Sequence, residues 1–189
     1  MLDILFTNAR THRAWIDKPV NDDTLRSLYD LMKWGPTSGN CFPIRILFLR
    51  TREAKERLRP ALSPNNVDKT MTAPVTAILA YDINFAEHTK LFVENPMIQE
   101  RFAGLPPDKK EMLALKSASL QGGYFILAAR AVGLDCGPMG GFDNAKVDQE
   151  FFSGTAVKSN FLCNLGHGNP AALKPRSPRL DFDEACKML

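Results

Sequence analysis

Apolar and polar residues follow a helical period in the first part of the chain. Polar residues 21–23 precede Leu25, Leu28 and Met32, which fall on one face of a predicted helix. The acidic residues among 21–23 lie at the positive end of the helix dipole. We expect Gly35, in the left-handed conformation of a C′ residue, and Pro36 to end this helix.

Three apolar stretches predict β-strands. Residues 44–50, IRILFLR, are apolar on both faces, which is typical of a central strand that is covered on both sides. The stretch VTAILAYD, which starts at Val75, and residues 158–165 predict a second and a third buried strand. Between the first two strands, Thr51 is expected to cap a short helix, REAKERLR, that Pro60 ends.

The longest helical pattern covers residues 108–132. Gly133 is expected to stop this helix, and Leu134 supplies the hydrophobic contact of a Schellman end. Two glycines in the middle cost about 1 kcal/mol each relative to alanine, so we expect a close backbone neighbour from the same chain or from a second subunit. The small residues of this section are Ser117, Ala118, Ser119, Gly122, Gly123, Ala128 and Ala129.

The other segments carry less regular patterns. Residues 63–74 place Asn66 and Lys69 on one side of a helical turn, unless this segment is a solvated connector. Residues 82–107 are interpreted as an irregular surface excursion, a kind of segment that often supplies lids and substrate walls. The stretch CGPMGGFD is interpreted as a tight turn before a helix that Asp143 caps, and not as a dinucleotide fingerprint. A basic, proline-rich tail follows, which either frays or docks on a partner.

The composition is that of an ordinary globular chain. With 189 residues, 44% hydrophobic and 24% charged, we expect one domain over residues 1–189. No apolar run is long enough to span a bilayer, and the N-terminus lacks the pattern of a signal peptide, so we predict a cytoplasmic protein without a membrane partner. A net charge of +3 with evenly spread basic residues argues against nucleic-acid binding.

The cysteines and histidines do not suggest a catalytic or metal site. The four cysteines are widely spaced, so we expect reduced thiols packed as small hydrophobes rather than disulfides or a zinc site. His12, His88 and His167 lie far apart in the sequence, and no Ser-His-Asp or paired-carboxylate pattern is present. We therefore assign neither a general acid nor a metal ligand.

Two segments concentrate polar side chains. Near the N-terminus, Arg10, Thr11 and Arg13 suit an oxyanion, because guanidinium groups match phosphate geometry and a hydroxyl adds a short donor. The alternative for this cluster is a solvated surface. Residues 34–45, WGPTSGNCFPIR, form a polar loop that is also compatible with a simple helix-to-strand connection. The polar side chains of this loop include Thr37, Ser38 and Asn40.

In this order, these segments resemble the motifs of the FMN-dependent nitroreductase family, over about residues 4–186. The opening RTHRAW, followed by PV, is similar to the family's phosphate-binding R-S-x-R-x-F. The loop PTSGN, with Pro43 after it, is similar to P-S-S-x-N-x-Q-P. Asn66 and Lys69 match the next flavin-binding position, PMGGFD matches the P-x-x-G-F-x turn over the flavin, and Arg179 matches the C-terminal basic residue.

The resemblance implies an α+β, nitroreductase-like fold with a central, mostly antiparallel sheet flanked by helices. It also implies an intertwined homodimer with two FMN sites at the interface. NAD(P)H would be the electron donor, in a ping-pong hydride transfer through flavin N5. The residues implied to bind FMN, some of them from the partner chain, are Arg10, Thr11, Arg13, Thr37, Ser38, Asn40, Asn66, Lys69, Pro138, Met139, Gly140, Gly141, Arg176 and Arg179.

A narrower resemblance, to one subgroup of the family, indicates which acceptor is reduced. The stretches LMKWGPTSGNC, KERLRPALS and GLDCGPM resemble most a subgroup that reduces malonic semialdehyde to 3-hydroxypropionate in pyrimidine utilisation. Phe42 and Ile44 stand where the wider family commonly carries Gln and Trp, which argues against nitroaromatic specificity. Two alternatives remain open, a broad NAD(P)H quinone or nitro-compound reductase and a non-catalytic protein that stores or senses FMN. Arg45 is a candidate for binding the carboxylate of the acceptor.

Overall fold

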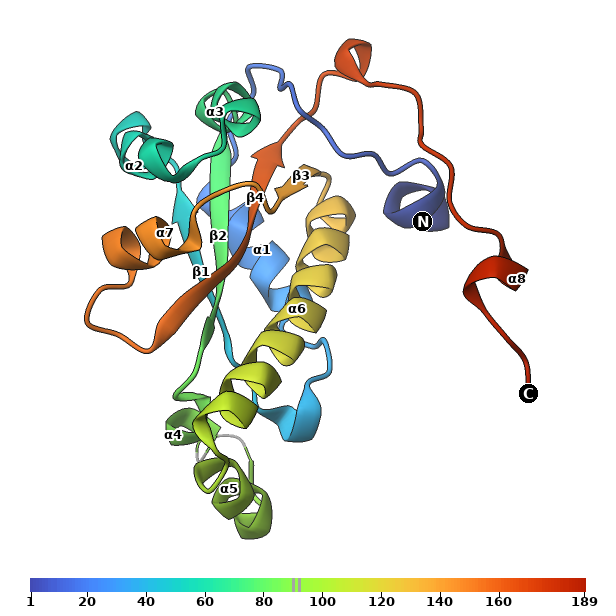
Figure 1. Cartoon of the computed structure of the whole chain (residues 1–189). Helices are drawn as coiled ribbons and strands as arrows, with labels where there is room; N and C mark the ends of the chain where they lie inside the picture. The colour runs from blue at the N-terminus through green and yellow to red at the C-terminus, as the bar shows by residue number, and fades with distance from the viewer. Residues whose placement is uncertain (90, 92) are drawn as a thin grey trace.

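A four-stranded antiparallel sheet in the order β1-β2-β4-β3 forms the centre of the protein (Figure 1). The structure, a computed structural model, describes residues 1–89, 91 and 93–189. Helices flank the sheet on both faces, which confirms the predicted α+β class with an antiparallel sheet. The strands are β1 (Ile44–Leu49), β2 (Val75–Asp82), β3 (Asp135–Met139) and β4 (Val157–Gly166).

Two hydrophobic cores lie on the two faces of the sheet. The helix α6 (Pro107–Ala131) crosses one face, with α1 (Asp22–Met32) beside it, while α2 (Arg52–Leu58) and α7 (Asn144–Phe151) cover the other (Figure 1). Residues of the fully buried β2 alternate between the cores, so Leu79 packs toward α1 and α6 whereas Ile78 packs toward α2 and α7. The helix α3 (Pro64–Met71) follows α2 and leads into β2.

The first strand differs from its prediction in position. Residues 44–50 were expected to form a central strand, but β1 pairs only with β2 and lies at the edge of the sheet. Its side chains still meet helices on both faces, because Ile44 belongs to one core and Leu49 to the other. An edge strand that is covered on both faces has the same apolar pattern as a central strand, so the pattern alone does not separate the two.

The segment CGPMGGFD was predicted as a turn, and this is wrong for its first half. Residues 135–139 form β3, which pairs with β4 at the other edge of the sheet. Pro138 lacks a donor for the ladder, but an edge strand tolerates a proline. The second half behaves as predicted, since the Asp143 side chain accepts a hydrogen bond from the first turn of α7.

The predicted helix ends are confirmed at several positions. The side chains of Asn21 and Thr51 accept hydrogen bonds from backbone N–H groups in the first turns of α1 and α2. At the end of α6, Gly133 has φ +83°, and the N–H of Leu134 donates to the Ala129 carbonyl at 2.9 Å. This hydrogen bond and the positive φ of Gly133 complete the predicted Schellman end.

The prediction for Gly35 is wrong. The helix α1 already ends at Met32, and Gly35 does not have a positive φ. A Cβ atom on Gly35 would instead lie 2.7 Å from Cγ of Tyr124 in α6. A glycine is needed here because the end of α1 packs directly on α6.

The excursion over residues 82–107 contains regular structure that the sequence analysis missed. It forms α4 (Phe85–Thr89) and α5 (Pro96–Ala103), and the rings of Phe85 and Phe102 meet edge-to-face at 5.4 Å. Both phenylalanines are buried in the core under α6. Lys90 and Phe92, which belong to the same stretch, lie outside the described residues.

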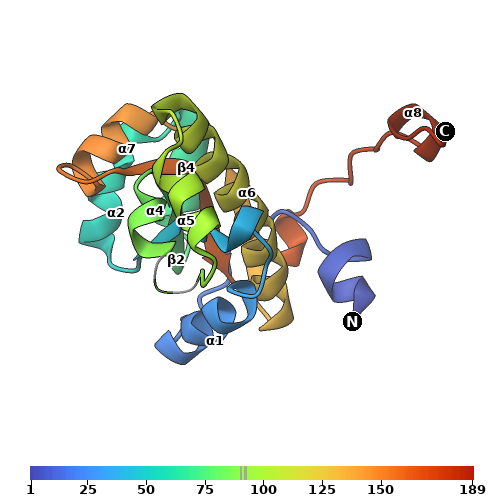
Figure 2. The ribbon, with the colours of Figure 1, turned by 90° about the horizontal axis from the view of Figure 1, so that it is seen from below.

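The two chain ends lie together and extend away from the sheet (Figure 2). Arg130 of α6 donates to the Leu5 carbonyl at 2.8 Å, which ties the N-terminal turn to α6. Cys186 is exposed in this tail, whereas the other three cysteines are buried free thiols as predicted. The remaining helical turns are η1 (Asp3–Thr7), η2 (Ser38–Asn40), η3 (Arg59–Ala61), η4 (Pro170–Ala172) and α8 (Phe182–Ala185).

No helix in the described part of the chain combines the length and the apolar character needed to cross a bilayer.

Candidate functional site

A basic pocket of about 450 Å³ lies between the N-terminal segment and the C-terminal tail. Arg10, Thr11 and Arg13 line it from the N-terminal segment, and Arg176 and Arg179 line it from the tail. These five predicted residues come from the two ends of the chain, and the fold brings them to one place. Clustered guanidinium groups with a hydroxyl suit a phosphate or a similar oxyanion.

The basic pocket is also lined by two cations that the sequence analysis did not assign to a site. Lys174 lies in the tail, and Arg130 lies in the last turn of α6. Lys174 belongs to the same KPRSPR run as Arg176 and Arg179, so that run could have identified it. Arg130 carries no comparable signal, because a basic residue is common in the last turn of any helix.

Hydrogen bonds between the two chain ends hold the basic pocket together. The Arg176 guanidinium donates to the carbonyls of Thr7 at 2.7 Å and Ala9 at 2.9 Å, and the Arg10 guanidinium donates to the Lys174 carbonyl. A guanidinium group has five N–H donors, so these bonds leave donors for a bound anion.

The helix α3 and the turn after β3 bring the next predicted residues together. Asn66 is buried and its Nδ2 donates to the Gly141 carbonyl at 2.6 Å. Burial lowers the pKa of Lys69, and the nearby positive charge of Arg13 lowers it further. Lys69 therefore lies near enough to Arg13, a residue of the basic pocket, to feel its charge. The Met139 side chain, in contrast, is buried in the core.

A buried asparagine on β4 connects the segments that carry the cations. The Lys69 carbonyl accepts hydrogen bonds from Asn164 Nδ2 at 3.0 Å and from the indole of Trp15 at 3.1 Å. Thr76 on β2 donates to Asn164 Oδ1 at 2.7 Å. Asn164 and Thr76 are fully buried, so this network fixes α3 against the segment that carries Arg13.

His12 holds the same segment from its other side. Its ring is buried, Nε2 lies 3.3 Å from Asp135 Oδ1, and Asp135 Oδ2 accepts from the Gly168 N–H at 2.8 Å. A Cβ atom on Gly168 would overlap the His12 ring, and a Cβ atom on Gly137 would lie 2.6 Å from the His12 carbonyl. The role of His12 was not predicted, since it depends on partners more than a hundred residues away in the sequence.

The predicted residues Thr37, Ser38 and Asn40 lie away from the basic pocket. Their loop packs against α5 and the middle of α6, where Cys41 Sγ donates to Ser117 Oγ at 3.3 Å. The basic pocket is lined by Arg130, which lies in the last turn of α6. The helical rise of about 1.5 Å per residue places Ser117 and Arg130 roughly 20 Å apart.

The predicted site residues therefore form two groups within one protomer. We call them the basic group and the loop group. The basic group consists of Arg10, Thr11, Arg13, Asn66, Lys69, Pro138, Gly140, Gly141, Arg176 and Arg179, whereas Met139 lies in the core and belongs to neither group. The loop group consists of Thr37, Ser38 and Asn40.

The backbone of the loop group has an unusual shape. Gly39 and Asn40 both have φ +55°, and Phe42 has φ +40°. Glycine and asparagine adopt such angles readily, but a phenylalanine rarely does. The Phe42 N–H donates to the Thr37 hydroxyl at 3.3 Å, which helps to close the loop. This strain was not visible in the sequence.

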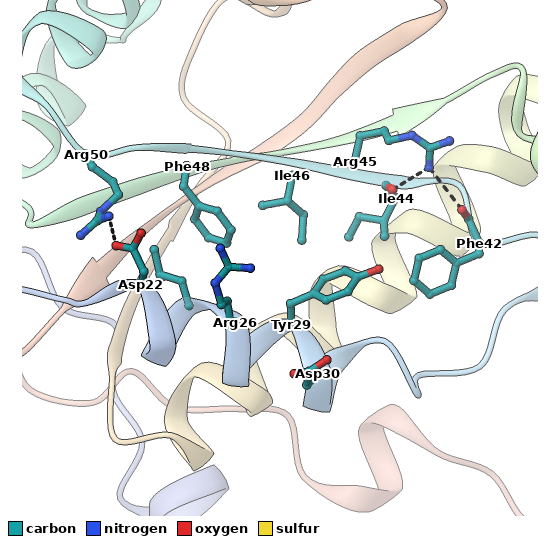
Figure 3. Close-up of a pocket in the computed structure, with 11 residues that line it drawn as sticks. Asp22, Arg26, Tyr29, Asp30, Phe42, Ile44, Arg45, Ile46, Phe48 and Arg50 are labelled. Atoms are coloured by element: carbon teal, nitrogen blue, oxygen red, sulfur yellow. Dashed lines mark hydrogen bonds and ion pairs between the residues drawn. The ribbon is translucent and has the colours of Figure 1, made fainter.

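A groove of about 650 Å³ runs between β1 and α1 (Figure 3). Ile44, Ile46 and Phe48 point from β1 toward α1, whereas Arg45 points away from this row (Figure 3). Arg45 Nη2 lies 2.7 Å from Asp82 Oδ2, so the candidate ligand for an acceptor carboxylate already has an acidic partner.

Comparisons with known proteins agree with this antiparallel α+β fold. The sequence model of the nitroreductase family matches residues 7–153. A protein of Cupriavidus pinatubonensis with the provisional name NADH dehydrogenase/NAD(P)H nitroreductase is 53% identical over 190 residues, which cover 100% of this chain and 97% of that protein. A protein of Leptothrix cholodnii with the same provisional name is 55% identical over 189 residues, which cover 100% and 95% of the two chains.

The fold is also found in solved structures. A provisionally assigned nitroreductase of Exiguobacterium sibiricum, determined in complex with FMN, matches with a TM-score of 0.87 at 20% identity. The match covers 100% of this chain and 96% of that one. The chain belongs to the nitroreductase family.

Proposed function

We propose that the protein is an FMN-dependent NAD(P)H oxidoreductase. The observation that carries this proposal is that Arg10, Arg13 and Arg179, which match the family's motifs, line one pocket although they come from the two ends of the chain. Bound FMN supplies the hydride transfer between NAD(P)H and an organic acceptor, while the protein positions and tunes the reactants.

The cations of the basic group and the Thr11 hydroxyl fit the phosphate of FMN. Arg10, Arg13 and Arg176 line the pocket and would each offer guanidinium N–H donors to the phosphate, and the Thr11 hydroxyl would add a further donor. Burial lowers the pKa of Lys69. A bound phosphate beside Lys69 would oppose this effect, because its negative charge stabilises the charged ammonium.

The turn after β3 offers room for a flat ring against the backbone. Apart from Gly140 and its two chain neighbours, no described residue has an atom within 4 Å of the position that a Cβ atom on Gly140 would take. The N–H groups of this turn are suited to the stabilisation of negative charge that develops on a bound ring. The open space beside Gly140 supports the assignment of this turn to the flavin site.

A homodimer would complete the site. Within one protomer the loop group lies roughly 20 Å along α6 from the basic group, too far for one flavin ring to meet both. We propose that the loop group of one protomer meets the basic group of its partner. Thr37, Ser38 and Asn40 would then bind the same FMN as the cations.

The outer face of α6 supports such an assembly. Leu115, Leu120 and Tyr124 are exposed on this face around Gly123. Apart from its chain neighbours and the adjacent backbone of α6, no described atom lies within 4 Å of the position that a Cβ atom on Gly123 would take. An exposed apolar face with a low-bulk centre is typical of an interface between helices.

We propose a small aldehyde such as malonic semialdehyde as the preferred acceptor, with 3-hydroxypropionate as the product. The support is the subgroup resemblance around GPTSGNC and GLDCGPM, together with Phe42 and Ile44 at positions where the wider family carries Gln and Trp. The provisional names of the relatives favour a second candidate, a broad quinone or nitro-compound reductase.

The flavin is tested first. The protein should purify yellow, and chromatography of the denatured protein should release FMN. A colourless protein that cannot be reconstituted with FMN would contradict the proposed function. If NAD(P)H does not reduce the bound flavin, or if organic acceptors do not reoxidise it, the protein would be a storage or sensor protein instead.

The acceptor is tested next, by kcat/KM for malonic semialdehyde, menadione and a nitrofuran at one pH and one nicotinamide concentration. We expect the aldehyde to be preferred. A preference of about tenfold or more for the quinone or the nitro compound would exclude the aldehyde while keeping the oxidoreductase.

A further inference from the structure

We propose that Arg45 and Asp82 are positioning residues that hold the loop group in its strained shape. In this arrangement the ion pair clamps the backbone around Phe42 and so fixes how Thr37, Ser38 and Asn40 face their ligand. The inference rests on the proposed function, because it takes the loop group as part of the flavin site.

The strain at Phe42 requires something to hold it. A phenylalanine at φ +40° is in a sparsely populated region of backbone space. Such conformations persist where the surrounding structure over-determines them, and they concentrate at functional sites. Contacts that fix the exit of the loop are therefore part of its function.

Arg45 supplies contacts at this exit. Its Nη1 donates to the Ile44 carbonyl at 2.9 Å and lies 3.5 Å from the Phe42 carbonyl (Figure 3). Its Nη2 donates to Asp82 at 2.7 Å. The Arg45 side chain is 33% exposed and that of Asp82 only 8%, so the pair lies where solvent screens it weakly.

Asp82 is itself anchored at the end of β2, so it gives Arg45 a fixed partner. Its backbone N–H donates to the Pro43 carbonyl at 2.9 Å, which joins β2 directly to the loop. Its Oδ1 accepts from the Asn84 N–H at 2.8 Å, and His88 Nε2 of α4 lies 3.5 Å from its Oδ2. The carboxylate thus connects the loop, β2 and α4.

The helix α6 holds the opposite flank of the loop. Cys41 Sγ donates to Ser117 Oγ at 3.3 Å, and the Ile44 N–H donates to Gln121 Oε1 at 3.2 Å. With α6 on one side and the Arg45–Asp82 pair on the other, the strained segment is fixed at both flanks.

The competing assignment is that Arg45 binds the carboxylate of an anionic acceptor. The two assignments predict opposite results for Asp82→Asn. This change removes the partner of Arg45, so a positioning pair is broken, whereas a substrate-binding Arg45 is released for its ligand. The two variants Arg45→Gln and Asp82→Asn are therefore compared with each other as well as with the wild type.

The experiment measures FMN affinity by titration of the apoproteins, and kcat/KM with malonic semialdehyde and with uncharged menadione. We expect Arg45→Gln and Asp82→Asn each to weaken FMN binding about tenfold, which corresponds to about 1.4 kcal/mol. Both should shift the absorption spectrum of the bound flavin and lower kcat/KM for both acceptors. The double variant should be no worse than either single variant, because the two side chains act as one unit.

Arg50→Gln is the matched control. Arg50 follows the other end of β1, lines the same groove and pairs with Asp22, but it is far from the strained loop. It should bind FMN like the wild type. Arg45→Lys keeps the charge without the planar fork and should give a smaller loss of affinity, of about threefold, in a protein that folds.

Two results would overturn the proposal. One is that Arg45→Gln and Arg45→Lys retain wild-type FMN affinity and raise only the KM for the anionic acceptor, while Asp82→Asn leaves that KM unraised. The other is that all these variants behave like Arg50→Gln. A wild-type protein without FMN affinity would overturn the proposed function as well, whereas a normal wild type with unchanged variants would overturn this inference alone.

Discussion

At the scale of single residues, Arg13 links two parts of the basic group. It lines the basic pocket, and its charge acts on Lys69 of α3. We predict that Arg13→Ala weakens FMN binding by about 1.5–3 kcal/mol, the usual size of a hydrogen bond to a charged group, or roughly ten- to a hundredfold. Titration of the apoprotein measures this change.

The control for Arg13→Ala is Arg52→Ala. The Arg52 side chain is 83% exposed and pairs with Glu56 in its own helix, so its removal should leave FMN affinity unchanged. Equal affinities of the wild type and Arg13→Ala would mean that the anion binds elsewhere.

The residues that sequence reasoning found and those that it missed differ in what defines them. Arg10, Arg13 and Lys69 were named as site candidates because charge type and spacing within a motif are visible in the sequence. The roles of His12 and Asn164 were not, because their partners Asp135 and the Lys69 carbonyl come close only in the folded chain. Buried positioning groups of this kind have no local signature.

At the scale of elements, one polar cluster joins β2, β4 and α6. The Tyr81 hydroxyl donates to Glu111 Oε1 at 3.2 Å, and Lys158 Nζ donates to the same oxygen at 2.8 Å. Burial, followed by the negative charge of Glu111, raises the pKa of Tyr81 to about 12. The neutral phenol is therefore the form that the folded protein favours.

This cluster predicts a loss of stability at high pH. In the unfolded chain Tyr81 ionises near pH 10, whereas in the folded protein it keeps its proton to about pH 12. The stabilisation is complete below about pH 10 and is lost as the pH rises toward 12, because only the unfolded state releases the proton. Urea unfolding should show this loss, on the order of 2 kcal/mol, in the wild type and not in Tyr81→Phe. Parallel pH profiles for the two proteins would contradict the assignment.

The sequence predicts an element well when its signal is local. The caps Asn21, Thr51 and Asp143 and the Schellman end at Gly133 are each defined within a few residues. The edge position of β1, the strand β3 and the packing of Gly35 on α6 depend on long-range pairing instead. The helices α4 and α5 are too short for a clear helical period, with five and eight residues.

At the scale of the whole molecule, the separation of the two groups of site residues is the main reason to propose a dimer. Their membership in one motif set was visible in the sequence, but their distance within one protomer was not. A second copy that packs on the exposed face of α6 would bring a loop group to each basic group. Assembly and FMN binding should then be coupled.

Gly123 allows this coupling to be tested without damage to the protomer. The position has open space around it, so Gly123→Leu should fit within one protomer and improve helix propensity by up to about 1 kcal/mol. Across an interface the same side chain would hold two helices apart. We predict a shift to monomer in sedimentation together with a loss of FMN affinity of at least about tenfold, since half of each site would be lost.

Gly123→Ala is the graded control, because one methyl group separates the helices less. It should keep more of the dimer and more of the FMN affinity than Gly123→Leu, with a similar or higher thermal stability of the apoprotein. A native protein that sediments as a flavin-loaded monomer would contradict the dimer. A Gly123→Leu monomer that binds FMN as tightly as the native protein would show instead that one protomer holds a complete site, and that the loop group serves another purpose.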